Sequence, residues 1–345
     1  MARVLLLATT TGYQTRAFGD AAERLGVQLV FATDRCRTLD DPWRDGAIPI
    51  RFHDENGSVA AVLDSARFRP IDGIIAVGDR PTVIAARIAQ RLGLPGHPPE
   101  AAEVARDKER TRHRLRDAGL PVPWFVASPI YADPRVIAAT IDFPCVVKPV
   151  ALSASRGVMR VDNAEQFSAA YERLQALMRQ PEIRAEQNDA HQRVLIEGFI
   201  PGREFALEGL LHQGGLTVLA LFDKPDPLDG PFFEETIYVT PSSLDAGMQA
   251  SVTEAVARAS AAIGLFHGPI HAECRVNDRG IFVIEIAARP IGGLCARALR
   301  FVSRQSTVDS PRSRSHKCPS KSFCCGTPWE NHRRVGSGSR LPPAS

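Results

Sequence analysis

Two glutamates and one arginine, Glu273, Glu285 and Arg289, have types and spacing that could do chemistry together. The glutamates lie in alternating apolar segments on either side of the turn 277–280, a pattern that favours a β-hairpin. Adjacent strands would bring the two carboxylates together, where they repel each other unless a cation lies between them. Mg²⁺ prefers such oxygen ligands, and an arginine four residues later could grip a phosphate or carboxylate with its fork. The alternative is an ordinary hairpin with two solvated glutamates.

The first hundred residues must supply a scaffold for this hairpin, and their pattern alternates between strands and helices. Segments 3–8, 27–32 and 71–77 are apolar and predict buried strands, whereas 81–92 and a segment ending at Gly26 predict helices. Strands that alternate with helices indicate a doubly wound parallel sheet. The sequence contains neither the G-x-G-x-x-G dinucleotide fingerprint after the first strand nor a Walker A motif.

The middle of the chain carries lysines and glutamates inside otherwise apolar elements. Lys148 lies in a strand at 144–149, where an unpaired charge would be costly, so a functional role is favoured. A small-residue loop at 151–157 follows it. The remaining predicted elements are a charged helix at 103–118 that contains Lys108, a helix from a cap at Asp162 and Glu165 to about Met178, a polar loop at 179–192, a strand at 193–200, further strands near 204–208 and 216–222, and a helix at 247–263. The loop 225–235 either faces substrate or is simply solvated.

Taken in order, these motifs resemble the ATP-grasp superfamily over about residues 1–301. The resemblance is closest to the biotin-carboxylase-like and L-amino-acid-ligase-like branch of carboxylate–amine ligases. It implies an α/β protein: an N-terminal doubly wound parallel sheet, the pre-ATP-grasp domain, over 1–104. An α+β ATP-grasp domain would follow over 105–301, with a mobile lid subdomain at about 122–195.

The resemblance also implies roles for individual residues. Arg289 and Lys148 would be catalytic, and Glu273 and Glu285 would hold Mg²⁺, with Mn²⁺ as a substitute. Glu197 would lie near the adenine amino group and Glu204 near the ribose. The full set of expected ATP-binding residues is Lys108, Lys148, Ser153, Ser155, Gly157, Glu197, Gly198, Phe199, Ile200 and Glu204.

One position departs from the family pattern, which usually has an asparagine two residues after the second glutamate. Here that residue is Ala287. Three functions therefore remain open. The first is an ATP-dependent carboxylate–amine ligase that acts through an acyl-phosphate on a small carboxylate and an amine, most readily an amino acid. The second is a carboxylase that phosphorylates bicarbonate, which the short loop 153–157 disfavours. The third is an ATP-binding protein without turnover.

Composition sets the expected environment. The 345 residues are 44% hydrophobic and 23% charged, as in ordinary globular proteins, and no apolar run approaches the roughly 20 residues that span a bilayer. Seven scattered cysteines suggest reduced thiols and a cytoplasmic location. We therefore expect no membrane partner and no nucleic acid. A homodimer is a further expectation, since related enzymes are often dimers.

The last 44 residues differ from the rest of the chain. Residues 302–345 contain ten serines, eight basic residues, two acidic residues and three of the seven cysteines, without periodicity. Such a composition predicts disorder. A sharper hypothesis is that this aberrant tail is a frameshifted readout, because plausible codons for 317–331, read one base earlier, encode an amphipathic helix. The sequence of the gene decides between them.

Overall fold

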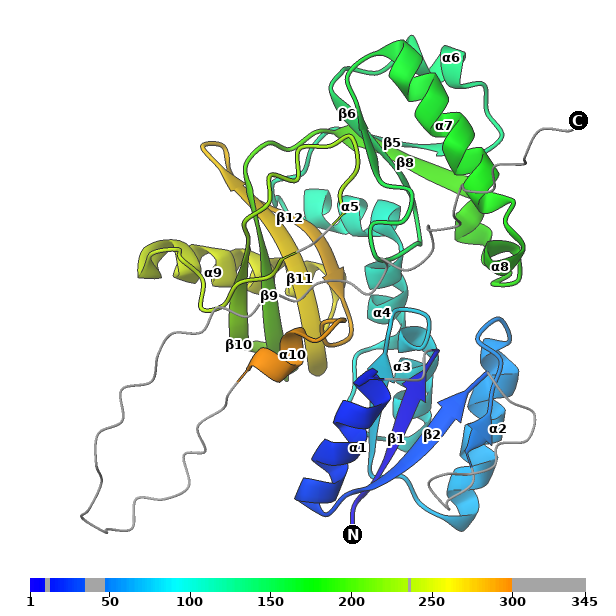
Figure 1. Cartoon of the computed structure of the whole chain (residues 1–345). Helices are drawn as coiled ribbons and strands as arrows, with labels where there is room; N and C mark the ends of the chain where they lie inside the picture. The colour runs from blue at the N-terminus through cyan, green and yellow to red at the C-terminus, as the bar shows by residue number, and fades with distance from the viewer. Residues whose placement is uncertain (10–12, 35–46, 235–236, 300–345) are drawn as a thin grey trace, which may run out of the picture.

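The computed structural model describes residues 1–9, 13–34, 47–234 and 237–299. In this part of the chain, four-stranded sheets form three bodies that meet around the middle of the molecule (Figure 1). The hypothesis of a frameshifted tail concerns residues outside the described part. No described helix combines the length and the apolar content needed to cross a bilayer.

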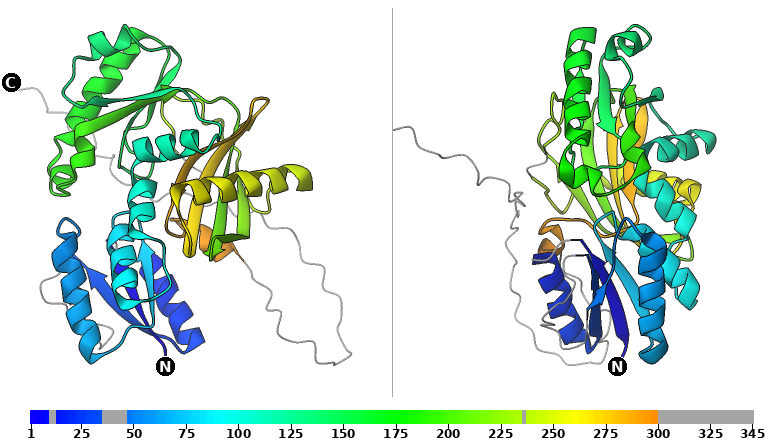
Figure 2. Two further views of the ribbon diagram at one scale, coloured as in Figure 1. Left: turned by 180° about the vertical axis from the view of Figure 1, so that it is seen from behind. Right: turned by 90° about the vertical axis from the view of Figure 1, so that its right-hand side faces the viewer.

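The N-terminal body is a parallel sheet with helices on both faces (Figures 1 and 2). Its elements are β1 (Arg3–Ala8), α1 (Tyr13–Leu25), β2 (Gln28–Thr33), β3 (Ile48–Pro49), α2 (Glu55–Phe68), β4 (Gly73–Val77) and α3 (Thr82–Leu92). The strands run in the order β3-β2-β1-β4, which confirms the predicted doubly wound sheet. Leu5, Val30 and Ile84 are buried between the strands and the helices. The short β3 and the helix α2 were not predicted.

The second body is an antiparallel sheet covered by helices, at the top of Figure 1. Its elements are β5 (Phe125–Pro129), α6 (Pro134–Ala138), β6 (Cys145–Pro149), β7 (Met159–Val161), α7 (Ala164–Met178), α8 (Pro181–Arg184), the 3₁₀ helix η1 (Asp189–Gln192) and β8 (Arg193–Gly198). We call this body the lid. Phe167, Tyr171 and Leu174 of α7 pack on its sheet.

Two local predictions for the lid were wrong. The N-cap of α7 is Asn163, whose side chain accepts from the Gln166 N–H at 3.0 Å, rather than Asp162 with Glu165. Gln166 in turn accepts from the N–H of Asp162 at 2.8 Å, the residue before the cap, so the contacts resemble a capping box but do not close on the cap residue itself. The predicted loop 179–192 contains the short helices α8 and η1, because proline at the first turn and Asn188 at a cap start them locally.

The third body is an antiparallel sheet in the order β10-β9-β11-β12, with α9 (Ala246–Ile263) along one face (Figures 1 and 2). Its strands are β9 (Arg203–His212), β10 (Gly215–Lys224), β11 (Gly268–Asn277) and β12 (Gly280–Ala287), and α10 (Cys295–Ala298) follows. Val252 and Val256 of α9 join the main apolar core beneath the sheet. The opposite face carries charged side chains such as Glu204 and Glu208 beside a smaller apolar cluster that contains Ala206 and Phe222.

A pair of helices connects the N-terminal body to the rest, and it corrects the prediction of one helix over 103–118. The segment is broken into α4 (Pro99–Arg106) and α5 (Lys108–Asp117). Asp107 between them is extended, with φ −111° and ψ 106°, and its side chain caps α5 by accepting from the Arg110 N–H at 2.9 Å. The break makes Lys108 the first residue of α5, and its N–H donates to the Val150 carbonyl at 3.0 Å. Lys108 is thereby attached to the loop that follows β6 of the lid, which we call the lid loop.

Candidate active site

The two glutamates that opened the sequence analysis lie opposite each other on β11 and β12. Glu273 pairs with Glu285, and the strands are joined at Asn277 and Gly280, which confirms the predicted hairpin. The register shifts directly beyond this pair, where Cys274 faces Val283, so Ile284 is an extra residue in β12. Such a β-bulge re-aims neighbouring side chains and is frequent beside active sites.

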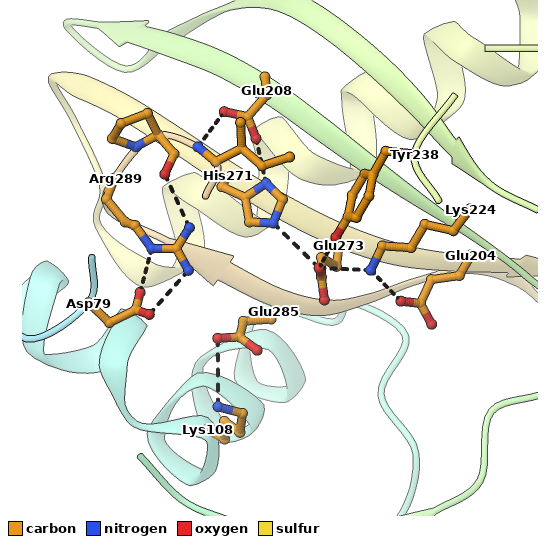
Figure 3. A network of polar contacts seen from close by, with 12 residues as sticks. Asp79, Lys108, Glu204, Glu208, Lys224, Tyr238, His271, Glu273, Glu285 and Arg289 are labelled. Carbon is orange, nitrogen blue, oxygen red and sulfur yellow. Dashed lines mark hydrogen bonds and ion pairs between the residues drawn. The ribbon is translucent and has the colours of Figure 1, made fainter. Parts of the chain in front are cut away.

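Cationic side chains surround both carboxylates (Figure 3). Lys224 donates to Glu273 and to Glu204, each at 2.8 Å, while Lys108 lies 3.6 Å from Glu285. Burial alone would raise the pKa of Glu273, but Lys224 and His271 outweigh burial and hold the pKa well below its ordinary value. Glu273 is therefore set to be anionic, as a metal ligand must be.

His271 extends this network away from the hairpin. Its Nε2 lies 3.4 Å from Glu273, and its Nδ1 contacts Glu208. Burial disfavours the charged imidazole, yet Glu208 and Glu273 raise the pKa of His271 to about 9. The other oxygen of Glu208 accepts from the Ile291 N–H at 2.9 Å. A continuous set of polar contacts thus connects Glu273 with the segment that follows Arg289.

Arg289 is held from the N-terminal body by a residue that sequence reasoning missed (Figure 3). Its Nε and Nη2 donate to the two oxygens of Asp79 at 2.8 and 3.1 Å, and its Nη1 donates to the Pro290 carbonyl at 3.1 Å. Burial would raise the pKa of Asp79, but Arg289, Lys108 and a hydrogen bond with Ser153 lower it overall. Asp79 comes two residues after β4, and the carboxyl ends of parallel strands are where open α/β sheets bind ligands, so the signal was present in the sequence.

A second buried group lies on the lid side of the site. Lys148 on β6 is 3% exposed and forms an ion pair with Glu197 at the end of β8. Arg112, on α5, grips the same carboxylate with Nε at 2.8 Å and Nη2 at 3.2 Å. Burial raises the pKa of a carboxyl group, but Arg112 and Lys148 bring that of Glu197 down to about 2. Sequence reasoning missed Arg112, although it lies four residues after Lys108 and so on the same helix face.

The small-residue loop lies between β6 and β7 and is tied to the site at its first residues. Lys108 donates to the Leu152 carbonyl at 2.7 Å, and Ser153 reaches Asp79. Ala154 and Ser155 both have positive φ, 57° and 52°, a strained backbone of the kind found at ligand sites. Gly157 also has positive φ, 75°, and a Cβ there would lie 2.7 Å from the Leu174 side chain, so both backbone conformation and packing within the lid favour glycine.

Gly198, Phe199 and Ile200, which were predicted to bind ATP, lie where the chain passes from β8 of the lid to β9 of the third body. The Phe199 ring lies between two guanidinium groups, with Arg160 at 4.3 Å and Arg275 at 5.2 Å. Arg275 also donates to the Ile200 carbonyl at 2.7 Å and to Glu204 at 2.9 Å. Arg275 and Lys224 therefore both hold Glu204, the predicted ribose ligand.

The loop 225–235 left two readings open, and its described part packs against the lid. The Arg160 N–H donates to the Pro231 carbonyl at 2.9 Å, and Met159 bridges to Phe232. Leu228 is buried, and its carbonyl accepts from Arg275. These contacts argue against a purely solvated loop in the described part.

The donor set fits a hard divalent cation with few protein ligands. Within the described residues, His, Cys, Asp and Glu side chains form no group of three or more that could hold a metal. Ala287 stands where the family usually has asparagine. It is 4% exposed, pairs with His271 across the hairpin and has a methyl side chain, which offers no oxygen to a metal. Mg²⁺ is commonly bound by one or two carboxylates, with waters and substrate phosphates completing its octahedron, and Glu273 with Glu285 meets that requirement.

Two family models match this chain: an ATP-grasp N-terminal domain over residues 19–96 and an ATP-grasp domain over residues 141–298. The chain belongs to the ATP-grasp superfamily. The relatives that it resembles lie on the carboxylate–amine ligase branch, as the sequence motifs predicted. The described site contains Lys148, Glu197, Glu204, Glu285 and Arg289, which the ATP-grasp resemblance named.

Three relatives illustrate the similarity. Carnosine synthase 1 of Gallus gallus is 32% identical over 250 residues, which are 69% of this chain and 26% of that protein. Alanine–anticapsin ligase of Bacillus subtilis is 27% identical over 288 residues, 78% of this chain and 60% of that protein. The crystal structure of an L-amino acid ligase from Bacillus licheniformis superposes with a TM-score of 0.69 and 27% identity, covering 84% of this chain and 67% of that one. This ATP-grasp chain thus spans about a quarter to three fifths of these curated relatives.

Proposed function

We propose that this protein is an ATP-dependent ligase that joins a small carboxylate to an amine, most readily an amino acid. The observation that carries the proposal is the Glu273–Glu285 pair, flanked by Lys108 on one side and by Arg289 beyond the end of β12. Two carboxylates for a metal and several cations for phosphates are what phosphoryl transfer requires. The names of the relatives, a carnosine synthase and two amino-acid ligases, support the same reaction class.

The proposed reaction has two steps. An oxygen of the substrate carboxylate attacks the γ-phosphorus of ATP, the bond to the β-phosphate oxygen breaks, and ADP leaves. The amine nitrogen then attacks the acyl carbon of the acyl-phosphate, phosphate leaves, and the nitrogen loses a proton. Lys108 and Lys148 would neutralise phosphate charge, and Arg289 would hold the transferred phosphoryl group. Catalysis would rest mainly on positioning and charge stabilisation.

Mg²⁺ would be held by Glu273 and Glu285 and would neutralise charge on the β- and γ-phosphates. Lys224 and Lys108, which contact these carboxylates in the structure, would then share them with the ion. Ser153 and Ser155 would approach the phosphates from the lid loop, which we propose closes over the nucleotide. Gly198, Phe199, Ile200 and Glu204 would line the base and ribose.

The cellular setting and the assembly of the protein are part of this proposal. Cys145, Cys274 and Cys295 are buried free thiols, which suits a reducing cytoplasm. The domain boundaries at 104 and 301 and the homodimer remain predictions.

The test is release of ADP from MgATP in the presence of pairs of L-amino acids, with the product identified by mass spectrometry. Hydroxylamine added in place of the amine should trap the acyl-phosphate as a hydroxamate. Bicarbonate alone in place of the amino acids tests the carboxylase alternative. If the protein binds MgATP but releases no ADP with any of these partners, the third alternative, a nucleotide-binding protein without turnover, replaces the ligase.

A further inference from the structure

Arg112 is the largest fully buried side chain in the described part of the molecule, with 0% exposure. A buried guanidinium is unfavourable unless its donors are satisfied. Here Nε and Nη2 bind Glu197 through both oxygens, and Nη1 donates to the Ile284 carbonyl at 2.8 Å. One side chain on α5 therefore connects the end of β8 with the bulge in β12.

Glu197 has little capacity left for another partner. Its side chain is 5% exposed, and its Oε1 accepts from both Arg112 and Lys148 while Oε2 accepts from Arg112. Three charged donors thus converge on one buried carboxylate. The direction of the Lys148 ammonium group is consequently set by Glu197, and the direction of Glu197 is set by the two-pronged grip of Arg112.

The second contact of Arg112 acts on the metal strand. Ile284 is the extra residue of the bulge and directly precedes Glu285. Holding its carbonyl fixes the backbone at the point where the side chain of Glu285 leaves the strand.

We propose that Arg112 is a positioning residue for ATP binding: through Glu197 it aims Lys148 at the phosphates, and through the Ile284 carbonyl it orients Glu285. Glu197 then acts by holding Lys148, which differs from the adenine contact that the resemblance implies. The proposal rests on the proposed ATP site but not on ligation, because every readout below is nucleotide binding.

Glu197→Gln, measured with MgATP and MgITP, separates the two roles of Glu197. Inosine carries an oxygen in place of the adenine amino group, so it lacks the donor that a base-contacting glutamate would bind. A positioning role predicts that the affinities for MgATP and MgITP fall by the same factor, at least about tenfold, because a charge-assisted hydrogen bond is lost. Weakening of MgATP alone, with MgITP unchanged, would overturn the proposal.

Arg112→Met, with MgATP affinity measured against pH, tests the connection to Lys148. The charged groups that act on the Lys148 ammonium are Glu197, Arg112 and Lys108, and burial lowers its pKa to about 8. Wild-type affinity should fall above pH about 8. In Arg112→Met, the affinity for MgATP should drop about tenfold. The loss of affinity at basic pH (the basic limb of the profile) should begin at a higher pH, because a positive charge that repels the Lys148 ammonium is gone. Arg112→Lys should show the same drop in affinity, because lysine cannot grip both oxygens and Ile284 together.

Arg114→Met is the matched control, because Arg114 lies on the same helix, is exposed and pairs only with Glu100 among the described residues. It should leave both the affinity and the limb unchanged. If Arg112 had only a structural role, Arg112→Met would have a lower melting temperature, but the folded protein would bind MgATP with wild-type affinity. The pH above which that affinity falls would also be unchanged. That result would overturn the proposal. If Arg112→Met does not fold, Arg112→Lys and Glu197→Gln decide the matter by the affinity measurements above.

Discussion

Asp79 and Arg289 are 210 residues apart in the chain and form a two-pronged ion pair, with Nε–Oδ1 at 2.8 Å and Nη2–Oδ2 at 3.1 Å. With the bond from Nη1 to the Pro290 carbonyl, three of the five N–H donors of the guanidinium are used. Within the described residues, one N–H on Nη1 and one on Nη2 remain for an oxyanion. The N-terminal body thus orients the arginine that is proposed to hold the phosphoryl group.

Asp79→Asn should therefore impair turnover more than nucleotide binding. The amide keeps the shape of the carboxylate but removes its charge and one acceptor, so Arg289 loses part of its orientation. We expect kcat/KM for ADP release to fall about 10- to 100-fold, with the Kd for MgATP changed less than about threefold. Steady-state kinetics and calorimetry measure the two quantities. Asp64→Asn, at an exposed pair in the same body, is the control; equal losses in turnover and MgATP binding would contradict this role.

Glu285→Gln and Glu273→Gln should both weaken metal-dependent ATP binding but differ in stability. Glu285 is 26% exposed, and its one ion pair among the described residues, with Lys108, is 3.6 Å long, so its loss should change the melting temperature little. Glu273 is less exposed and bonds the buried Lys224 at 2.8 Å, so its loss removes one of the two carboxylates that Lys224 contacts and should lower the melting temperature more. Titrations with ATP and Mg²⁺ should show at least about a tenfold loss for each variant. Without Mg²⁺ the variants and the wild type should bind ATP alike; a difference there would count against a metal role.

The charge of Lys148 should give ATP binding a basic limb. Its pKa lies at about 8, so the ammonium group is present below that pH and is lost above it. Binding a triphosphate favours the charged form, hence the Kd for MgATP should rise as the pH goes from 8 to 10. Lys148→Arg keeps its charge throughout this range and should bind with a flatter profile, though more weakly at neutral pH because the guanidinium has a different shape. If the Kd for MgATP rose just as much between pH 8 and 10 in Lys148→Arg, a group other than Lys148 would be responsible for the pH dependence.

His97 should make the connection between the first and third bodies sensitive to acid. Its Nδ1 accepts from the Phe266 N–H at 3.2 Å and its Nε2 donates to the Pro269 carbonyl at 3.1 Å, which requires a neutral ring. Burial lowers its pKa below the ordinary value of 6.5. The unfolded chain therefore binds the proton more readily, and stability should be present above pH 6.5 and decline as the pH falls below it.

Melting temperatures between pH 7.5 and 5 check this prediction for His97. His97→Gln keeps a donor for Pro269 but does not titrate, so it should lose fewer degrees on acidification than the wild type, although its melting temperature at pH 7.5 should be lower. A parallel decline in both proteins would remove His97 from the explanation.

Elements with regular periodicity could be predicted from the sequence, and so could the side chains that they carry. The hairpin with Glu273 and Glu285 is one case, because alternating residues and a short polar turn determine its register as far as Cys274 and Val283, whereas the bulge at Ile284 was not predicted. The break at Asp107 escaped prediction because the helical pattern continues through it, while a single capping side chain ends the first helix and starts the second.

The contacts between bodies could not be predicted in the same way. Nothing in the periodicity of residues 71–92 or 103–118 says that Asp79 meets Arg289, or that Arg112 meets Glu197. Such pairs depend on how separate sheets pack. Each of these side chains did carry a local hint, one at the carboxyl end of a parallel strand and the other one turn after a predicted phosphate-binding lysine.

The bulge at Ile284 makes the pairing of β12 as important as its composition. Val283 and Ile286 both pack in the core with α9, an odd spacing that regular alternation does not allow, and Glu285 between them faces the opposite side of the sheet. If β12 paired through Ile284 without a bulge, strict alternation would place Glu285 on the same face as Val283, toward the helix. Extra residues at the turn tip, Asp278 and Arg279, would lengthen a loop and leave the pairing intact. The face that Glu285 occupies therefore depends on the irregular pairing at Ile284 and not on the length of the turn.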